Sequence, residues 1–141
     1  MSKKEILEDE DLFSLYAAGK RDFTEYIPAL VDVGGSNLSE VDFSGWSADE
    51  VCFDFTDLSK ARFKGANFLQ VGFDKAILRE TDFTDARLHW CSFEGANLKG
   101  ANFSRAILKI VYFTGAILDE AIFDDVVYQY VVMPDGSVRE K

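Results

Sequence analysis

The sequence predicts an all-β solenoid in which four five-residue sides make one coil. Between residues 61 and 123 a large apolar residue returns at every fifth position, and a small residue usually stands two positions before it. A repeat of five matches neither the period of about 3.6 of a helix nor the period of about 2 of a flat strand, so the chain must turn after each short extended piece. A second period of twenty places like residues above one another in successive coils. Its clearest columns are Leu38, Leu58, Leu78, Leu98 and Leu118, and Phe43, Phe63, Phe83, Phe103 and Phe123.

An α-helix over residues 2–18 is predicted to cap the first coil, as part of an N-terminal segment 1–19. Ser2 and Glu5 fit a capping box at its start, and Gly19 is a suitable stop. The helix would turn one apolar face toward the solenoid. Such a cover is needed because the first coil otherwise exposes an unpaired strand edge, which favours aggregation.

The repeat is expected to begin irregularly and then to settle into a regular frame. Residues 20–35 are predicted to form an irregular first coil or loop, because Pro28 and Val33 occupy positions of large apolar residues. Residues 36–130 are predicted to form the β-helix itself, with about five coils of twenty residues. Residues 131–141 are predicted to form a turn and a tail that either folds back over the last coil or frays.

The regular frame contains one break. Trp46 stands at a position for a small residue, and Ala48 stands at the next position for a large one. Two interpretations remain open. Either the two positions exchange volume within an intact core, or the chain forms a local bulge here.

Three motifs in the repeat follow a common pattern: Ala66-Asn67-Phe68, Ala96-Asn97-Leu98 and Ala101-Asn102-Phe103. They resemble the repeat of the pentapeptide-repeat proteins, Ala-(Asp/Asn)-(Leu/Phe)-x-x. The segment 16–23 is also similar to the lead-in of members that are abundant in cyanobacteria. The resemblance covers residues 36–130 and implies a right-handed quadrilateral β-helix. It also implies a candidate activity, because some family members are dimeric rods that mimic DNA and bind type II topoisomerase.

The composition disfavours several classes of function. With 15 basic and 25 acidic residues the net charge is −10, which disfavours direct binding to nucleic acid or to an acidic membrane surface. No apolar run approaches the ~18 residues of a membrane span, and the acidic start lacks the apolar stretch of a signal peptide. A cytoplasmic location is therefore expected. Cys52 and Cys91 should lie about 10 Å apart on different sides of the chain, beyond the ~7 Å limit for a disulfide, so both are expected to be free thiols.

The sequence offers no set of residues for catalysis. His89 is the single histidine, and its phase in the repeat predicts a surface position. A His-based metal cluster and a Ser-His-Asp triad are therefore not expected, and no glycine-rich phosphate loop occurs. We expect no catalytic residue, no cofactor and no metal, and hence a protein that is not an enzyme.

A column of acidic residues is predicted on one side of the solenoid. Asp54, Asp74 and Glu94 each follow a phenylalanine of one column, so they should stack at intervals of ~4.8 Å. Like charges at this spacing repel one another. A cation or a basic partner would relieve the repulsion; alternatively, the row is solvated and partly neutralised by Lys75.

An apolar stripe is predicted along one outward corner. Trp90, Ile110 and Tyr130 share one phase on successive coils. A contiguous exposed apolar patch usually marks an interface, and a second copy of the chain could bury this one through the C-terminal coils. Alternatively, these residues simply suit strands, or the tail covers them. The candidate interaction surface comprises Leu69, Trp90, Ile107, Ile110, Tyr112 and Tyr130.

The sequence therefore predicts a non-enzymatic scaffold that presents rigid ladders of side chains to a partner protein. The alternative is a DNA-mimicking binder of type II topoisomerase, either a protector or an inhibitor. Duplex DNA carries one charge per ~1.7 Å, so a mimic needs acids along its whole length. Residues 1–60 carry 14 acids and 5 bases, residues 61–110 carry 5 and 8, and residues 111–141 carry 6 and 2. The middle segment is thus positive, and at ~4.8 Å per coil the body is only ~24 Å long, which together favour the scaffold.

Overall fold

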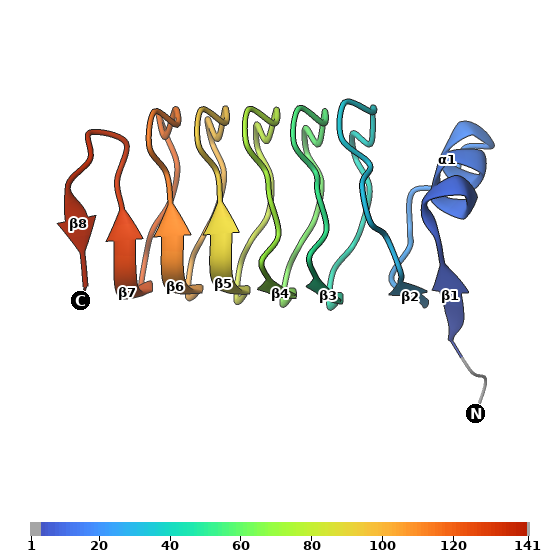
Figure 1. Ribbon diagram of the computed structural model, residues 1–141, viewed down its shortest axis with the longest axis horizontal. Helices are drawn as coiled ribbons and strands as arrows, with labels where there is room; N and C mark the ends of the chain where they lie inside the picture. The colour runs from blue at the N-terminus through green and yellow to red at the C-terminus, as the bar shows by residue number, and fades with distance from the viewer. Residues whose placement is uncertain (1–3, 141) are drawn as a thin grey trace.

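The computed structural model describes residues 4–140 as a stack of coils in chain order, with α1 at one end and β8 at the other (Figure 1). The elements are β1 (Glu5–Leu7), α1 (Asp9–Ala17), β2 (Tyr26–Pro28), β3 (Ser47–Asp49), β4 (Asn67–Leu69), β5 (Arg87–Ser92), β6 (Ile107–Tyr112), β7 (Val127–Val132) and β8 (Val138–Arg139). β1 and β2 form one parallel sheet, and β3 to β8 form another in sequence order. Strands β3 to β7 are parallel, and each residue pairs with the one twenty positions further on.

The other sides of each coil pair through single bridges at the same offset of twenty. On one side the bridged residues are Asp22, Asp42, Arg62, Asp82, Asn102 and Ile122, so six successive coils are present, one more than the sequence predicted. The predicted class, an all-β solenoid with one short helix at its N-terminal end, is confirmed.

A residue with positive φ stands at every fifth position from Gly35 to Tyr130, and these residues make the corners. Three of the four corners are closed by a hydrogen bond across a four-residue turn, except at Asp125 in the last coil. The Ala66 N–H, for example, donates to the Phe63 carbonyl at 3.0 Å, with Gly65 at φ 68° in third place. At the fourth corner no such bond closes the turn among residues 4–140, and β5, β6 and β7 instead run through it.

The core consists of inward columns in which aromatic rings stack along the solenoid axis. The Phe83 and Phe103 rings lie parallel, with centroids 4.9 Å apart and an interplanar angle of 2°. The neighbouring column meets this one edge to face, as the 88° angle between Phe83 and Phe93 shows. The predicted inward residues Leu78, Phe83, Phe93, Leu98 and Phe103 are all buried, so the five-residue frame is confirmed.

The N-terminal helix is shorter than predicted and starts later. The expected helix over 2–18 is wrong at its start, because Glu5 belongs to β1, and Ser2 lies outside the described residues. β1 pairs with β2 and buries Leu7, which a helix at this place would not achieve. The helix is capped by its own acids instead, since the Asp11 carboxylate accepts the Glu8 N–H at 3.2 Å.

Helix α1 lies against the first coil and is fixed to it by polar contacts. The Asp9 carboxylate accepts the N–H groups of Val31 and Asp32 at 2.9 and 3.2 Å. At the other end of the helix, the Tyr16 hydroxyl donates to the Ser39 carbonyl at 2.9 Å. Leu12 is fully buried between these two anchors. The helix therefore covers apolar side chains at this end of the solenoid.

Residues 20–35 belong to a first coil, which is one of the two alternatives in the prediction of an irregular first coil or loop. Phe23 and Val33 are buried in the core, and bridges join this coil to the next. Pro28 changes the backbone hydrogen bonding of this coil at one place. At the equivalent place on another side, the Leu38 N–H donates to the Asp57 carbonyl of the following coil, whereas Pro28 has no N–H to give. The sheet is accordingly interrupted between β2 and β3.

Trp46 and Ala48 exchange volume without disturbing the frame. Strand β3 pairs with β4 at the regular offset of twenty, so no bulge is present here. The Trp46 indole is buried and stacks on Phe43 at 3.9 Å. Ala48 is only half-buried.

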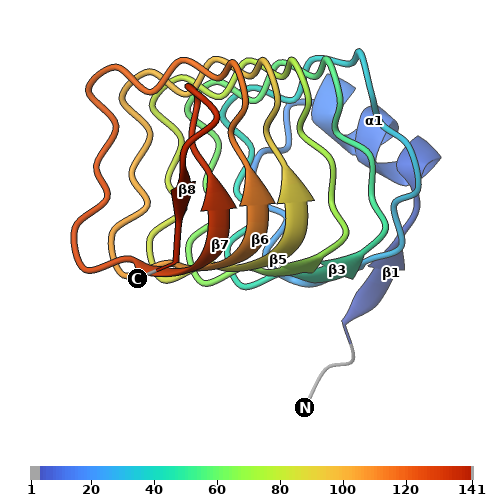
Figure 2. The same ribbon diagram turned by 60° about the vertical axis from the view of Figure 1, so that its left-hand side comes forward.

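The C-terminal segment folds back onto the last coil. β8 runs antiparallel to β7 and pairs with Val131 and Val132 (Figure 2). The Met133 N–H donates to the Ser137 carbonyl at 2.7 Å and closes the connecting turn. Within residues 4–140, the structure contains no helix with the length and apolarity that a membrane crossing requires.

Candidate interaction surface

The predicted apolar stripe lies at the corner that strands β5, β6 and β7 pass through. Trp90 and Tyr130 are 49% and 44% exposed, so the C-terminal tail leaves both of them open. Ile110, between them, is half-buried. We call these three residues, on successive coils, the apolar corner. The remaining predicted residues, Leu69, Ile107 and Tyr112, are half-buried on the two sides that meet there.

The backbone of the apolar corner is in an unfavourable conformation for its residues. Trp90, Ile110 and Tyr130 have φ values of 56°, 55° and 62°. A left-handed conformation costs an L-residue about 1–2 kcal/mol, and for a β-branched residue such as isoleucine it is a genuine outlier. The same conformation occurs at all twenty corner positions from Gly35 to Tyr130, of which six are glycine, as at Gly65, and fourteen carry side chains, as at Lys60. The apolar corner therefore differs from most other corners in the apolar character of its side chains, not in its backbone.

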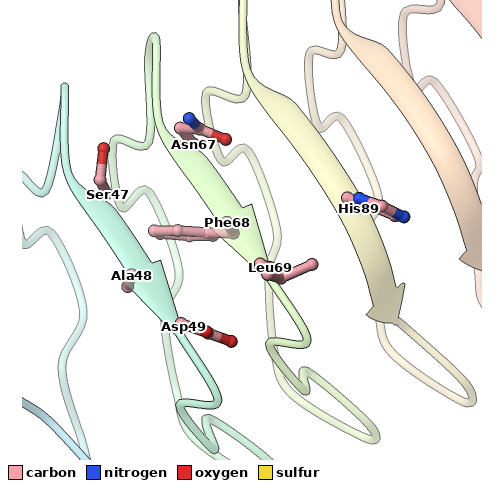
Figure 3. Close-up of a pocket in the computed structure, with 7 residues that line it drawn as sticks. All are labelled: Ser47, Ala48, Asp49, Asn67, Phe68, Leu69 and His89. Carbon is pink, nitrogen blue, oxygen red and sulfur yellow. The ribbon is translucent and has the colours of Figure 1, made fainter.

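A shallow hollow of about 400 Å³ lies beside the apolar corner, over β3, β4 and β5 (Figure 3). Ala48, Phe68 and Leu69 contribute its apolar lining. Asp49, Asn67 and His89 line the hollow. Sequence reasoning missed the hollow, because no repeat position signals it.

His89 is half-buried on the surface of β5, in agreement with its predicted outward phase. Its ring lies 5.1 Å from the Trp90 ring at an angle of 60°. The histidine is therefore continuous with the apolar corner. Within residues 4–140, no cluster of three or more His, Cys, Asp or Glu side chains is arranged to bind a metal.

The acidic column is built into the backbone hydrogen bonding of the solenoid. One Asp54 oxygen accepts the Asp74 N–H at 2.9 Å, and one Asp74 oxygen accepts the Glu94 N–H at 3.0 Å and the Ser92 hydroxyl. Each aspartate thus bonds the coil above it, and the N–H donors offset the repulsion between carboxylates. Gly72 makes room for this contact, since a Cβ there would lie 2.8 Å from an Asp54 oxygen. The carboxylates of Asp54 and Asp74 therefore have structural partners within the chain, and Glu94 takes part through its backbone N–H.

Both cysteines are free thiols, as predicted. Cys91 is buried in the core, and burial raises its pKa to about 12. Cys52 is half-buried, and its pKa is raised by desolvation and further by the charges of Asp54 and Asp32. A thiol needs its ionised form to act as a nucleophile. Neither cysteine has the environment of a reactive thiolate.

Comparisons with known proteins agree with the geometry. The model of the pentapeptide repeat region matches residues 49–123, and the model of pentapeptide repeats, with 8 copies, matches residues 31–65. The chain belongs to the pentapeptide-repeat family. Among curated proteins, no match was found.

Several solved structures share the fold. Rfr23, a pentapeptide repeat protein of the cyanobacterium Cyanothece 51142, is 21% identical with a TM-score of 0.66, over 68% of this chain and 79% of that one. A pentapeptide repeat protein from the thylakoid lumen of Arabidopsis thaliana is 30% identical with a TM-score of 0.54, over 66% and 61%. QnrB1, a plasmid-mediated fluoroquinolone resistance protein, is 17% identical with a TM-score of 0.53, over 76% and 65%. The chain therefore spans less than two thirds of the length of the last two.

Proposed function

We propose that this protein is a non-enzymatic scaffold that binds a partner protein through the apolar corner. The observation that carries the proposal is the row formed by Trp90, Ile110 and Tyr130, which place large apolar side chains at exposed or half-exposed corners of successive coils, where the same corner of earlier coils carries Glu50 and Gln70. A contiguous exposed apolar patch usually marks an interaction site. Aromatic residues also contribute strongly to binding energy at interfaces.

The rigidity of the surface supports the same function. Trp90, Ile110 and Tyr130 are anchored on strands that hydrogen-bond to the neighbouring coils, so binding orders little backbone. A pre-ordered surface loses less entropy on association than a flexible one. The cytoplasm is the compartment that we propose, and the two free thiols support it.

DNA mimicry remains the alternative, as a protector or inhibitor of type II topoisomerase, and the charges disfavour it. Residues 61–110 contain 8 bases and 5 acids, so the middle of the rod lacks the continuous negative charge of a duplex. A supercoiling assay with a type II topoisomerase distinguishes the two functions. The scaffold proposal expects no change in supercoiling at a tenfold excess of this protein.

The apolar corner is tested with a matched pair of double variants. Trp90→Ser with Ile110→Ser removes the corner, whereas Ile77→Ser with Ile117→Ser removes two exposed isoleucines from another side. Immobilised wild-type protein captures the partner from an extract of the source organism, and the affinity is then measured with the purified partner. We expect the corner variant to lose binding and the control variant to keep it. Equal affinity for both variants would refute the proposal, and sedimentation shows whether the partner is a second copy of the chain.

A further inference from the structure

The coil formed by residues 116–125 leaves core side chains open at the C-terminal end of the solenoid. Leu118 and Phe123 are half-buried, whereas their equivalents one coil earlier, Leu98 and Phe103, are fully buried. Within residues 4–140, β8 pairs only with Val131 and Val132 and leaves these two sides of the coil uncovered (Figure 2). The apolar columns therefore end at an accessible surface, which we call the open end.

The open end also carries unused backbone donors. In the preceding coil, the N–H groups of Leu98 and Gly100 donate to carbonyls of the coil above at 2.8 and 2.9 Å, and those of Phe103 and Arg105 do the same at 2.7 and 2.8 Å. The four N–H groups twenty residues further on, in the coil of residues 116–125, have no such acceptor in the part of the chain that the structure describes. A row of free donors beside apolar side chains is a template for an added strand. These four donors are the N–H groups of Leu118, Glu120, Phe123 and Asp125.

The charge of the open end determines which strand fits. Its outward side chains include four acids and no base: Asp119, Glu120, Asp124 and Asp125. On the coil below, bases stand at two of the same places, since Lys99 precedes Asp119 by twenty residues and Arg105 precedes Asp125. Arg105 is itself paired with Asp85 of the coil before it, at 2.9 Å. The ladder Asp85, Arg105, Asp125 alternates in sign, so a basic residue above Asp125 would continue it.

A second copy of the chain is a poor occupant of the open end. Two such ends facing each other would bring eight acidic side chains together, twice the four of one chain. Like charges that meet across an interface cost several kcal/mol. A basic strand, in contrast, would gain four acidic neighbours and four backbone donors.

We propose that the open end binds an extended segment of another protein as a further side of the solenoid. The segment presents small and large apolar residues inward and lysine or arginine outward. It accepts backbone hydrogen bonds from the four free N–H groups. This site is separate from the apolar corner, so the failure of either proposal leaves the other standing.

The chain supplies a probe and a matched control for this site. A synthetic peptide of residues 96–105 has net charge +2, from Lys99 and Arg105, whereas a peptide of residues 116–125 has net charge −4. Both carry Ala, Leu, Ala and Phe at the inward positions of the repeat. The two peptides therefore differ in their outward residues alone.

Binding is measured by NMR on the ¹⁵N-labelled 141-residue protein. We expect the basic peptide to shift the amide signals of Leu118, Glu120, Phe123 and Asp125 and to slow their hydrogen exchange. The acidic peptide should bind roughly tenfold more weakly or not at all, and added salt should weaken the basic one. Equal binding of both peptides, binding of neither, or shifts confined to other residues would overturn the proposal. A dimer that protects the same four amides would overturn it in favour of a second copy.

A charge-reversal variant sharpens the test. Asp119→Lys with Asp125→Lys changes two exposed side chains at the open end, and Glu40→Lys with Glu80→Lys makes the same change of net charge on inner coils. We expect the first variant, whose open end then carries two acids and two bases, to lose its preference for the basic peptide and the second to behave as wild type. An unchanged preference in the first variant would contradict the role of the acidic residues.

Discussion

The Trp46 indole Nε1–H donates to the Phe23 carbonyl at 2.9 Å, and this contact links the first coil to the second through the core. The same ring stacks on Phe43. Trp46 therefore replaces, with one side chain, both a small residue of its own column and part of the volume that Ala48 leaves empty. The contact also lies close to the interruption between β2 and β3, where the sheet gives no support.

Replacing the tryptophan should weaken this link. We expect Trp46→Phe to lower the free energy of unfolding by about 0.5–1.5 kcal/mol, because the Phe23 carbonyl loses its buried indole donor and keeps only the Tyr26 N–H, at 3.1 Å. Urea denaturation followed by circular dichroism measures the change. Trp90→Phe, at an exposed place, is the control and should change stability by less than about 0.5 kcal/mol. Equal effects of the two changes would show that the hydrogen bond does not contribute.

Replacing a leucine of the column Leu38 to Leu118 by alanine should lower the free energy of unfolding most in the middle of the solenoid. Leu98→Ala leaves a cavity in a closed core and should cost about 2–5 kcal/mol. Leu118→Ala removes the same side chain at the open end, where it is half-exposed, and should cost clearly less. Thermal and urea unfolding of both variants give the comparison. A larger loss for Leu118→Ala would mean that the open end is covered.

Because the backbone at Ile110 is left-handed, replacing this residue by asparagine should lower the free energy of unfolding only slightly. Asparagine tolerates this conformation, so Ile110→Asn relieves strain of about 1–2 kcal/mol that offsets the lost apolar contact. Ile107→Asn, at a half-buried strand position without positive φ, has no such relief. We expect Ile107→Asn to lower the free energy of unfolding by about 1–2 kcal/mol more than Ile110→Asn does. The reverse order would refute the strain at the apolar corner.

Stability should fall in alkaline solution because of Cys91. Its folded pKa of about 12 lies above the ordinary value of 9.0, so the unfolded chain loses this proton first. The stability that the buried, protonated Cys91 thiol contributes is therefore fully present below pH 9 and is lost as the pH rises toward 12. Cys91→Val, which matches Val71 and Val111 in the same column, should remove this part of the pH dependence. Urea titrations of both proteins between these pH values check it, and an identical pH dependence would contradict the prediction.

The contact between Asp54 and the next coil predicts a specific coupling with Gly72. Gly72→Ala places a Cβ against an Asp54 oxygen and should destabilise the fold, although the backbone of Gly72 does not have positive φ. Asp54→Ala should also destabilise it, by removing the acceptor for the Asp74 N–H. In the double variant the clash is absent, so the combined loss should be smaller than the sum by about 1 kcal/mol. Strict additivity in urea unfolding would exclude the proposed contact.

The sequence predicts the columns of this fold well because each column is enforced by repeated burial. Leu38 to Leu118 and Phe43 to Phe123 recur at one spacing, and a shift of one residue would expose all of them. The same signal weakens in residues 20–35. There Pro28 and Val33 fill their places with less typical side chains, although the coil still closes around Phe23.

Contacts between side chains and the backbone could not be predicted in the same way. The period places Asp54, Asp74 and Glu94 in a column, yet whether a carboxylate turns to solvent or to the next N–H depends on its rotamer. β1 was missed because three residues are too short to show a period. The apolar corner was located by phase alone, whereas its strain became visible only with the backbone angles.

Because paired strands are offset by a constant twenty residues, the length of this solenoid changes only in steps of one whole coil. Inserting or deleting one full coil in the repeat moves α1 and the open end apart or together by about 4.8 Å and leaves their relative orientation nearly unchanged. An insertion of five residues, in contrast, turns the open end by a quarter revolution relative to α1. The distance between the two ends can therefore be varied by insertions or deletions of twenty codons, and their relative rotation by insertions or deletions of five codons.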